Sequence, residues 1–239
     1  GVDAVLANAA VISVGAHDRD TIVRTNVEGT RNVMLAMADA GVRRAVYTST
    51  ATVYAPRADH TYREDDPLRD PAARGHRFNW YAISKSAAEQ AAWELATAHQ
   101  IALTAIRPHA IHGAWDEHGA TAWLRRMTGL PVGAWLAGTR FPSVYAGDLA
   151  DAVCAALERP VAAGRAYNIA GEPGAHTFWD LLRAWREAGG DTARIVLPIP
   201  APMARRYVID RARDELGFTN RPLVEGLRES LALERSGAL

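Results

Sequence analysis

A tyrosine and a lysine stand four residues apart in a segment without glycine or proline. Residues 81–85 read Tyr-Ala-Ile-Ser-Lys, and on a helix this spacing places Tyr81 and Lys85 on one face. A phenol with its ordinary pKa of about 10 is a poor base at neutral pH, but a neighbouring cation stabilises the phenolate and lowers that pKa. The pair therefore predicts acid–base chemistry, in which the phenol exchanges a proton with a hydroxyl of a bound molecule.

Lys85 is the single lysine of the chain. All but one of the 27 basic residues are arginine, so the chain has kept an ammonium at this position, where a compact charge must fit a narrow site. Thr50 ends a Thr-Ser-Thr cluster and could hydrogen-bond the same substrate oxygen as the phenol. The alternative interpretation is that Tyr81 and Lys85 are surface residues of a helix and have no chemical role.

The elements around this pair alternate between strand and helix signals. Apolar runs and helical periodicity predict strands at residues 2–7, 44–48 and 101–106, and helices at 26–40 and 81–99. This order implies parallel strands with right-handed crossovers, and in such sheets ligands bind beyond the carboxyl ends of the strands. Asn8, Thr50 and His109 follow three of those ends, so we expect them around one crevice of an α/β fold.

The second half is less regular. It is predicted to hold helices at residues 147–158, 178–188 and 223–233, and strands at 166–170 and 194–198, while residues 56–79 form a long polar loop. We place a soft boundary near Pro108. Residues 1–108 then form one region, and residues 109–239 form a smaller C-terminal region that partly returns to the sheet.

Composition excludes several classes of protein. Basic and acidic residues balance at 27 each, so we expect no nucleic acid or anionic membrane as a partner, and no apolar run reaches the roughly 18 residues of a membrane span. One cysteine, Cys154, suits the reducing cytoplasm, and we expect it to be buried. The histidines show no metal-ligand spacing, so no metal site is expected. The acidic run at residues 64–66 is predicted to be a solvated loop.

Several segments, taken in order, resemble landmarks of the extended short-chain dehydrogenase/reductase group, also called the NAD-dependent epimerase/dehydratase family. The matching segments lie at residues 26–30, 46–54, 81–85, 107–113, 148–152 and 166–171. The resemblance implies a Rossmann-like doubly wound parallel sheet, a nicotinamide cofactor (NAD or NADP), and hydride transfer at an alcohol or sugar carbon. It also implies that residues 1–108 are part of a dinucleotide-binding domain and that residues 109–239 mainly bind substrate.

The resemblance assigns roles to individual residues. Tyr81 is similar to the family's catalytic acid/base, and Lys85 to the lysine that holds the nicotinamide ribose and tunes the tyrosine. Thr50 stands where the family places a substrate-orienting Ser or Thr. The expected cofactor-binding residues, besides Lys85, are Asn8, Ala9, Ala10, Asn26, Pro108, His109 and Ile111. The helices at 26–40 and 81–99 resemble those of a four-helix homodimer contact.

The sequence departs from the family pattern in three places. It contains no glycine-rich phosphate loop, so we expect that about 60–80 residues of the family's fold precede this chain. Ala51 and Thr52 replace an Asp-Glu pair of the sugar dehydratases, which argues against dehydration. Residues 141–144 lack the arginine of nucleotide-sugar epimerases (Arg140 is one residue out of register), which weakens a nucleoside-diphosphate sugar as substrate.

Three functions remain open at this point. The first is the interconversion of a secondary alcohol and a ketone, the second is sugar epimerisation with tightly bound NAD, and the third is a non-catalytic truncated relative. Four tryptophans of the second half, at positions 115, 123, 135 and 179, bear on the first. They could line an apolar pocket for a steroid-like, flavonoid-like or polyketide-like alcohol, or they could be ordinary core packing.

Overall fold

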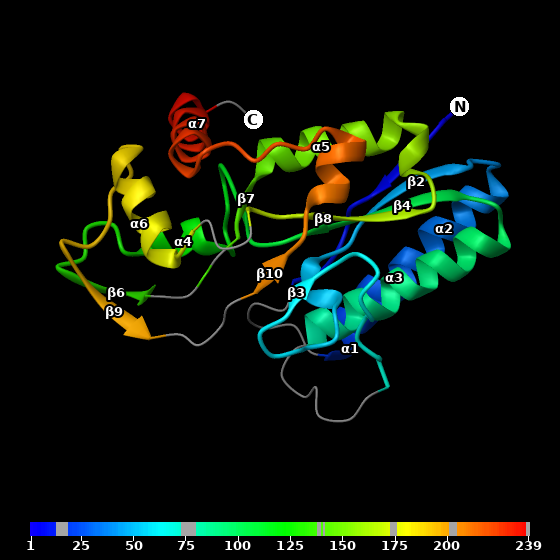
Figure 1. The fold of residues 1–239 in the computed structure, drawn as a ribbon, viewed down its shortest axis with the longest axis horizontal. Helices are drawn as coiled ribbons and strands as arrows, with labels where there is room; N and C mark the ends of the chain where they lie inside the picture. The colour runs from blue at the N-terminus through cyan, green and yellow to red at the C-terminus, as the bar shows by residue number, and fades with distance from the viewer. Residues whose placement is uncertain are drawn as a thin grey trace.

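A four-stranded parallel sheet forms the centre of the molecule (Figure 1). The computed structural model describes residues 1–12, 19–72, 80–137, 140, 142–172, 176–200 and 205–237. The sheet has the order β1-β2-β4-β8, and its strands are β1 (Val5–Ala7), β2 (Arg44–Thr48), β4 (Ala102–Pro108) and β8 (Arg165–Ile169). Because all of the strands are parallel, their carboxyl ends lie at one edge.

Helices cover both faces of this sheet. On one face lie α2 (Gly29–Asp39) and α3 (Trp80–Ala98), and on the other lies α5 (Ala146–Glu158). The first helix pair packs on the sheet through Met34, Ala45, Ala88 and Leu103, which are all buried. The alanine-rich face of α3 allows close approach to the strands, which is how a long helix comes to lie directly over β2 and β4.

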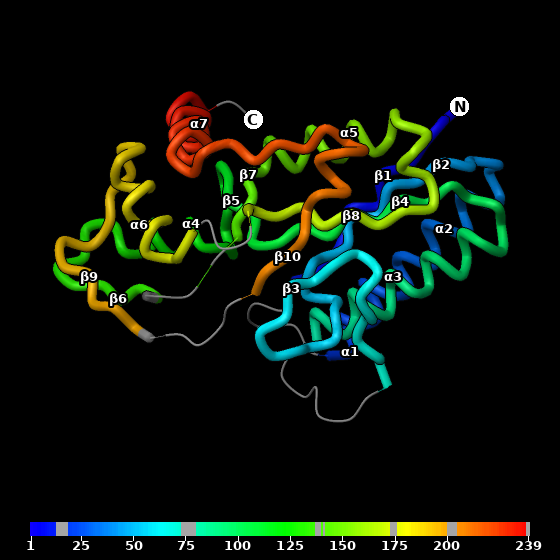
Figure 2. The backbone as a smooth tube through the Cα atoms, viewed as in Figure 1, coloured from blue at the N-terminus to red at the C-terminus, as the bar shows by residue number. Residues whose placement is uncertain are grey.

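The second lobe is built on a separate two-stranded parallel sheet (Figure 2). β6 (Val132–Ala137) pairs with β9 (Ile195–Pro200), and the helices α4 (Ala120–Arg126), α6 (Phe178–Glu187) and α7 (Leu223–Ser236) lie to one side of them. This lobe has its own apolar cluster around Leu181, Trp185 and Leu227. Two short strand pairs lie between the lobes: β3 (Thr61–Tyr62) with β10 (Arg206–Tyr207), and β5 (Ile111–His112) with β7 (Val144–Tyr145).

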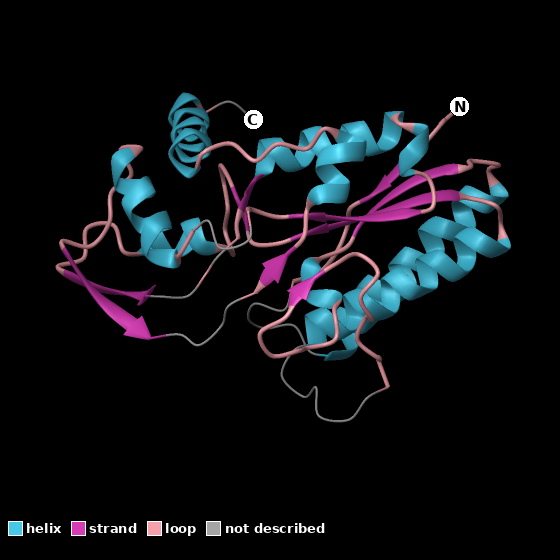
Figure 3. Cartoon of the chain, in the orientation of Figure 1, coloured by secondary structure: helices cyan, strands magenta, loops and turns pink. Residues whose placement is uncertain are grey.

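The α/β prediction and its parallel sheet are confirmed, with differences at the element ends (Figure 3). The strand at 44–48 is as predicted, whereas the strand expected at 101–106 continues to Pro108. The helix expected at 26–40 begins earlier, because α1 (Arg19–Val23) and a π-helical turn (Arg24–Glu28) run into α2. A second π-helical turn lies at Ala212–Leu216, and 3-10 turns lie at Ala51–Val53 and Pro160–Ala162.

Two expectations about exposure are wrong. Cys154 is exposed, because it lies on the outer side of α5. Glu64 is buried, because its carboxylate accepts a hydrogen bond from the backbone N–H of Asn168 in β8. The described helices include none that is both long enough and apolar enough to cross a membrane. The last part of the loop expected at 56–79, residues 73–79, lies outside the described residues.

Candidate active site

Thr50, Tyr81 and Lys85 meet at the carboxyl end of β2. Thr50 lies two residues beyond that strand and is buried, and Tyr81 lies in the first turn of α3. The Lys85 Nζ donates a hydrogen bond to the backbone oxygen of Thr48 at 2.6 Å and lies 4.4 Å from the centre of the Tyr47 ring. These two contacts fix the lysine against the strand end, with 2% of its surface exposed.

The pKa values of the pair are set mainly by burial. Burial raises the pKa of Tyr81, and a side-chain hydrogen bond with Thr50 opposes this rise. The direction of the pKa shift of Tyr81 is opposite to the lowering expected from the sequence, because desolvation of the phenol outweighs the hydrogen bond with Thr50. Burial lowers the pKa of Lys85 to about 8, and the Glu89 carboxylate acts against that change. At neutral pH the phenol is therefore protonated and the amine is still charged.

Asn26 holds the turn that follows β1. Its Oδ1 accepts a hydrogen bond from the Val11 N–H at 2.7 Å, and its Nδ2 donates to the Val11 oxygen at 3.0 Å and to Ser84 Oγ at 2.9 Å. Ser84 immediately precedes Lys85, so this buried amide ties the turn to α3. Asn8, Ala9 and Ala10 are exposed in that turn. Both polar atoms of the Asn26 side chain are thus hydrogen-bonded within the chain, and its contact with a cofactor stays a prediction.

The end of β4 carries the other expected cofactor residues. Pro108 is the last residue of β4, and the His109 N–H donates to the Ile169 oxygen at 3.0 Å. The His109 ring lies 4.9 Å from the Tyr207 ring, and burial lowers the pKa of His109 to about 4, so the imidazole is neutral at physiological pH. Ala110 adopts a left-handed φ of 50°, and Ile111 beyond it is 40% exposed. This turn directs Ile111 away from the sheet.

A buried ion pair beneath the site was not predicted from the sequence. Glu89 lies one helical turn after Lys85, and its carboxylate receives three hydrogen bonds from Arg107, the shortest being 2.5 Å from Nη2. Ser49 Oγ donates to Glu89 Oε2 at 2.5 Å, and the Trp93 indole N–H donates to Oε1 at 3.2 Å. Glu89 and Arg107 are at most 4% exposed. One carboxylate therefore joins α3 to the ends of β2 and β4.

The Arg107 guanidinium extends this network to the loops. Its Nη1 donates to the Tyr54 hydroxyl at 2.9 Å and to the Glu64 backbone oxygen at 2.8 Å, and the Tyr54 hydroxyl donates to Asn168 Oδ1 at 2.5 Å. A sequence signal for this pair did exist. A charged residue within an apolar strand, such as Arg107, must find a counter-charge, and Glu89 is the acidic residue on the face of α3 that holds Tyr81 and Lys85.

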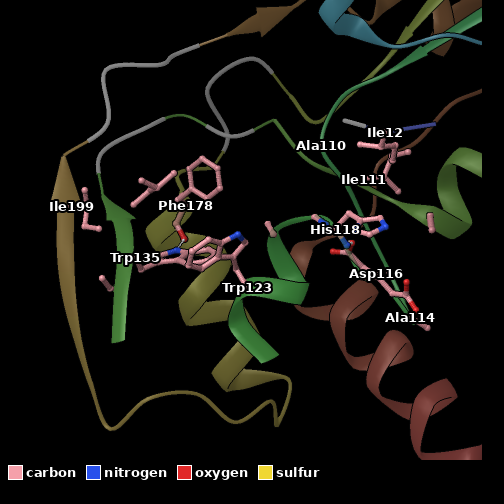
Figure 4. Close-up of a pocket in the computed structure, with 17 residues that line it drawn as sticks. Ile12, Ala110, Ile111, Ala114, Asp116, His118, Trp123, Trp135, Phe178 and Ile199 are labelled. Atoms are coloured by element: carbon pink, nitrogen blue, oxygen red, sulfur yellow. Dashed lines mark hydrogen bonds between the residues drawn. The ribbon is translucent and has the colours of Figure 1, made fainter. Parts of the chain in front are cut away.

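A large cavity lies beside the end of β4 (Figure 4). We call it the aromatic pocket. Its volume is about 740 Å³, and Ile12, Ala110 and Ile111 form one end. Trp123, Trp135 and Phe178 form the other end, and Asp116 and His118 lie between them. Thr50, Tyr81 and Lys85 do not line it. The pocket adjoins the site through the residues that follow β1 and β4.

The residues present fit the nicotinamide end of a dinucleotide. A Lys ammonium has three donors, and among the described residues Lys85 Nζ has one hydrogen bond, to Thr48, which leaves donors for the hydroxyls of a ribose. The exposed turn at residues 8–10 offers backbone groups behind small side chains. Among the described residues, no group of three or more His, Cys, Asp or Glu side chains is arranged to hold a metal ion.

The chain belongs to the NAD dependent epimerase/dehydratase family, whose model matches residues 1–170. Among curated proteins, an N-acetyl-alpha-D-glucosaminyl-diphospho-ditrans,octacis-undecaprenol 4-epimerase of Escherichia coli O157:H7 is 29% identical over 84% of this chain. A cinnamoyl-CoA reductase 1 of Oryza sativa subsp. japonica is 30% identical over 96% of the chain. The chain spans 61% of the length of the first and 69% of the second.

Solved structures share the fold. A UDP-glucose-4-epimerase from Stenotrophomonas maltophila, with bound NAD and formylated UDP-arabinopyranose, has a TM-score of 0.81 and 23% identity, and the match covers 99% of this chain and 77% of that one. The RMD protein of Pseudomonas aeruginosa, complexed with NADPH, also has a TM-score of 0.81, with 19% identity and coverage of 98% and 82%. These similarities establish the Rossmann-like fold.

Proposed function

We propose that the protein containing this chain interconverts a secondary alcohol and a ketone with NAD or NADP as the redox partner. The observation that carries the proposal is the meeting of Thr50, Tyr81 and Lys85 at the carboxyl end of β2, where open α/β sheets bind their ligands. Membership of an NAD-dependent family supports the choice of cofactor. When bound, the nicotinamide supplies or accepts a hydride.

The side chains provide the proton and the orientation. The Tyr81 phenol, whose pKa is raised by burial, is protonated at neutral pH and can donate its proton to the oxygen of a ketone as that oxygen gains negative charge. Thr50, which hydrogen-bonds the phenol, is placed to orient the same oxygen. Lys85 retains its charge and stabilises the phenolate that remains after proton transfer. In alcohol oxidation the proton travels in the opposite direction.

The test is to replace Tyr81 with phenylalanine in the intact protein that contains this chain. Loss of the hydroxyl removes the proton donor, so turnover of ketones with NADH or NADPH should fall by about 10²–10⁴-fold. The fold should be retained, because the ring stays in place. Ala87→Ser, six residues further along α3, is the control and should leave turnover unchanged. Wild-type rates in Tyr81→Phe would contradict the proposal.

Sugar epimerisation is the second candidate, and the identity with the Escherichia coli 4-epimerase over 84% of the chain favours it. The same three side chains would serve it, since a proton leaves and returns to one oxygen. Purified protein that retains a dinucleotide through dialysis and shows no net oxidation or reduction would favour this candidate.

A cytoplasmic location and a homodimer through residues 26–40 and 81–99 are further parts of the proposal, and sedimentation equilibrium tests the dimer.

A further inference from the structure

The aromatic pocket has the position of a substrate-binding cavity. Ile12 follows the turn held by Asn26, and Ala110 and Ile111 follow the end of β4, so one end of the pocket adjoins the proposed reaction site. From there it extends into the second lobe, towards Trp123 and Trp135 (Figure 4). A volume of about 740 Å³ lies within the range of about 300–1,000 Å³ that holds a drug-sized ligand.

The far end of the pocket is a fixed aromatic surface. The Trp135 indole N–H donates to the Phe178 backbone oxygen at 2.5 Å, and the Trp135 and Phe178 rings pack edge to face with centres 5.6 Å apart and an angle of 79° between their planes. The polar atom of Trp135 is thus occupied within the protein, and the residue is 4% exposed, so it forms part of the fixed wall of the pocket. Trp123 is 57% exposed beside it, although removing an indole from water is strongly favourable.

The charges around the pocket disfavour a diphosphate. No described lining residue is Lys or Arg, whereas Asp116 and Glu117 both line it. The Asp116 carboxylate accepts hydrogen bonds from the Gly119 and Thr121 N–H groups and from the Thr121 hydroxyl, so it is held in place at the pocket wall. A pyrophosphate needs cations such as bidentate arginine, and here it would face negative charge.

The nearby arginines of α4 are occupied elsewhere. Arg125 pairs with Glu234 and donates to the backbone oxygens of Asp116 and Gly113, and Arg126 donates to the backbone oxygen of Glu117. Each therefore supports the backbone of the pocket wall from behind. A charged ligand could recruit them only by breaking these bonds.

We propose that the aromatic pocket binds the non-reacting part of the substrate and that this part is an uncharged aromatic or polycyclic group, not a nucleoside diphosphate. The proposal rests on the proposed function, which places the reacting carbonyl at Thr50 and Tyr81, next to the end of the pocket formed by Ile12, Ala110 and Ile111. The ring system of the substrate then lies against Trp123, at the end of the pocket whose wall Trp135 and Phe178 complete.

The test measures binding and turnover separately. Isothermal titration calorimetry of the intact protein, with NADP or NAD present, compares acetonaphthone with UDP-glucose. We expect acetonaphthone to bind more tightly, and Trp123→Ala to weaken its binding about tenfold, as expected for loss of one aromatic contact. Trp115→Ala is the matched control, because Trp115 is 45% exposed on the same segment but does not line the pocket. It should leave the Kd within about twofold.

The outcomes separate this proposal from the proposed function. Tighter binding of UDP-glucose, or an acetonaphthone Kd that is the same in Trp123→Ala and wild type, would overturn the assignment of the pocket. If the protein still reduces cyclohexanone and Tyr81→Phe abolishes that reduction, the proposed function stands although the assignment of the pocket is wrong. Conversely, acetonaphthone binding that depends on Trp123, without turnover of any ketone, supports the pocket and contradicts the proposed function.

Discussion

The pKa values of Tyr81 and Lys85 predict how the direction of the reaction depends on pH. Because burial raises the pKa of Tyr81, the phenol that ketone reduction needs is present across the neutral range. The rate of ketone reduction should therefore stay constant with rising pH until Lys85 loses its proton near its pKa of about 8. Above that pH the rate should fall. Alcohol oxidation needs the phenolate and should rise with pH over the same range. Initial rates of both directions across this range check the prediction.

Lys85→Arg isolates the contribution of the amine. A guanidinium keeps its charge at every accessible pH, so any remaining reduction activity should lose the fall near pH 8, although the larger group lowers the rate overall. Thr52→Ser, in the 3-10 turn that follows Thr50, should keep the wild-type profile. A fall near pH 8 that persists in Lys85→Arg would show that another group causes it.

At the scale of elements, the Glu89–Arg107 pair predicts a graded loss of stability and function. Glu89→Gln leaves the Arg107 charge buried without a partner and should cost about 3–5 kcal/mol of unfolding free energy. Ser49→Ala removes one hydrogen bond to the carboxylate and should cost about 1–3 kcal/mol. Because Glu89 raises the pKa of Lys85, the fall of the reduction rate should also move to lower pH in Glu89→Gln.

Urea unfolding and pH–rate profiles check these effects together. Trp93→Phe is the control, since it removes the indole N–H from Glu89 but leaves Arg107 and Ser49 in place. It should have the smallest effect on both measurements. An unchanged position of the pH-dependent fall in folded Glu89→Gln would contradict the electrostatic link between α3 and the site.

Elements with strong local periodicity could be predicted, and long-range pairings could not. The strand Arg44–Thr48 is a short apolar run with a polar end, and α3 has an uninterrupted helical composition, so both were predicted to within a residue. The π-helical turn across Asn26 escaped prediction because apolar spacing does not distinguish it from an α-turn. The burial of Glu64 depends on Asn168, more than a hundred residues away, and no local pattern carries that information.

At the scale of the whole molecule, the two lobes contribute different parts of the site. The sheet with α2 and α3 holds Thr50, Tyr81 and Lys85, while the second lobe supplies the aromatic end of the pocket. The proximity of Tyr81 and Lys85 was predictable, because their spacing follows from one helix. The residues of the pocket wall could not be predicted from the sequence, because Trp123, Trp135 and Phe178 come from α4, β6 and α6 and share no periodicity. Of the four tryptophans weighed as pocket or core, Trp123 lines the cavity, Trp135 both lines it and belongs to the buried cluster of the second lobe, Trp179 packs against that cluster, and Trp115 does neither.

His112, which lies between the lobes in β5, predicts how the stability of the whole fold depends on pH. Its imidazole is 2% exposed, neither ring nitrogen has a hydrogen-bond partner among the described residues, and burial lowers its pKa to about 4 despite the nearby Asp116. The unfolded chain, in which histidine has its ordinary pKa of about 6.5, binds a proton more readily. The contribution of His112 is therefore fully present above about pH 6.5 and is lost as pH falls towards 4, by on the order of 3 kcal/mol.

Replacing His112 with phenylalanine should remove this part of the acid sensitivity. The ring packing against Tyr145 is kept, and removing two unpaired nitrogens should leave stability at neutral pH unchanged or slightly higher. Urea unfolding from about pH 7 to pH 4 should show a smaller loss of unfolding free energy than in wild type. His118→Phe, at an exposed histidine, should keep the wild-type loss. Equal losses of unfolding free energy in His112→Phe and wild type would contradict this prediction. They would mean that His112 is protonated as easily in the folded protein as in the unfolded chain, and that the junction between the lobes is more open to water than the burial of His112 implies.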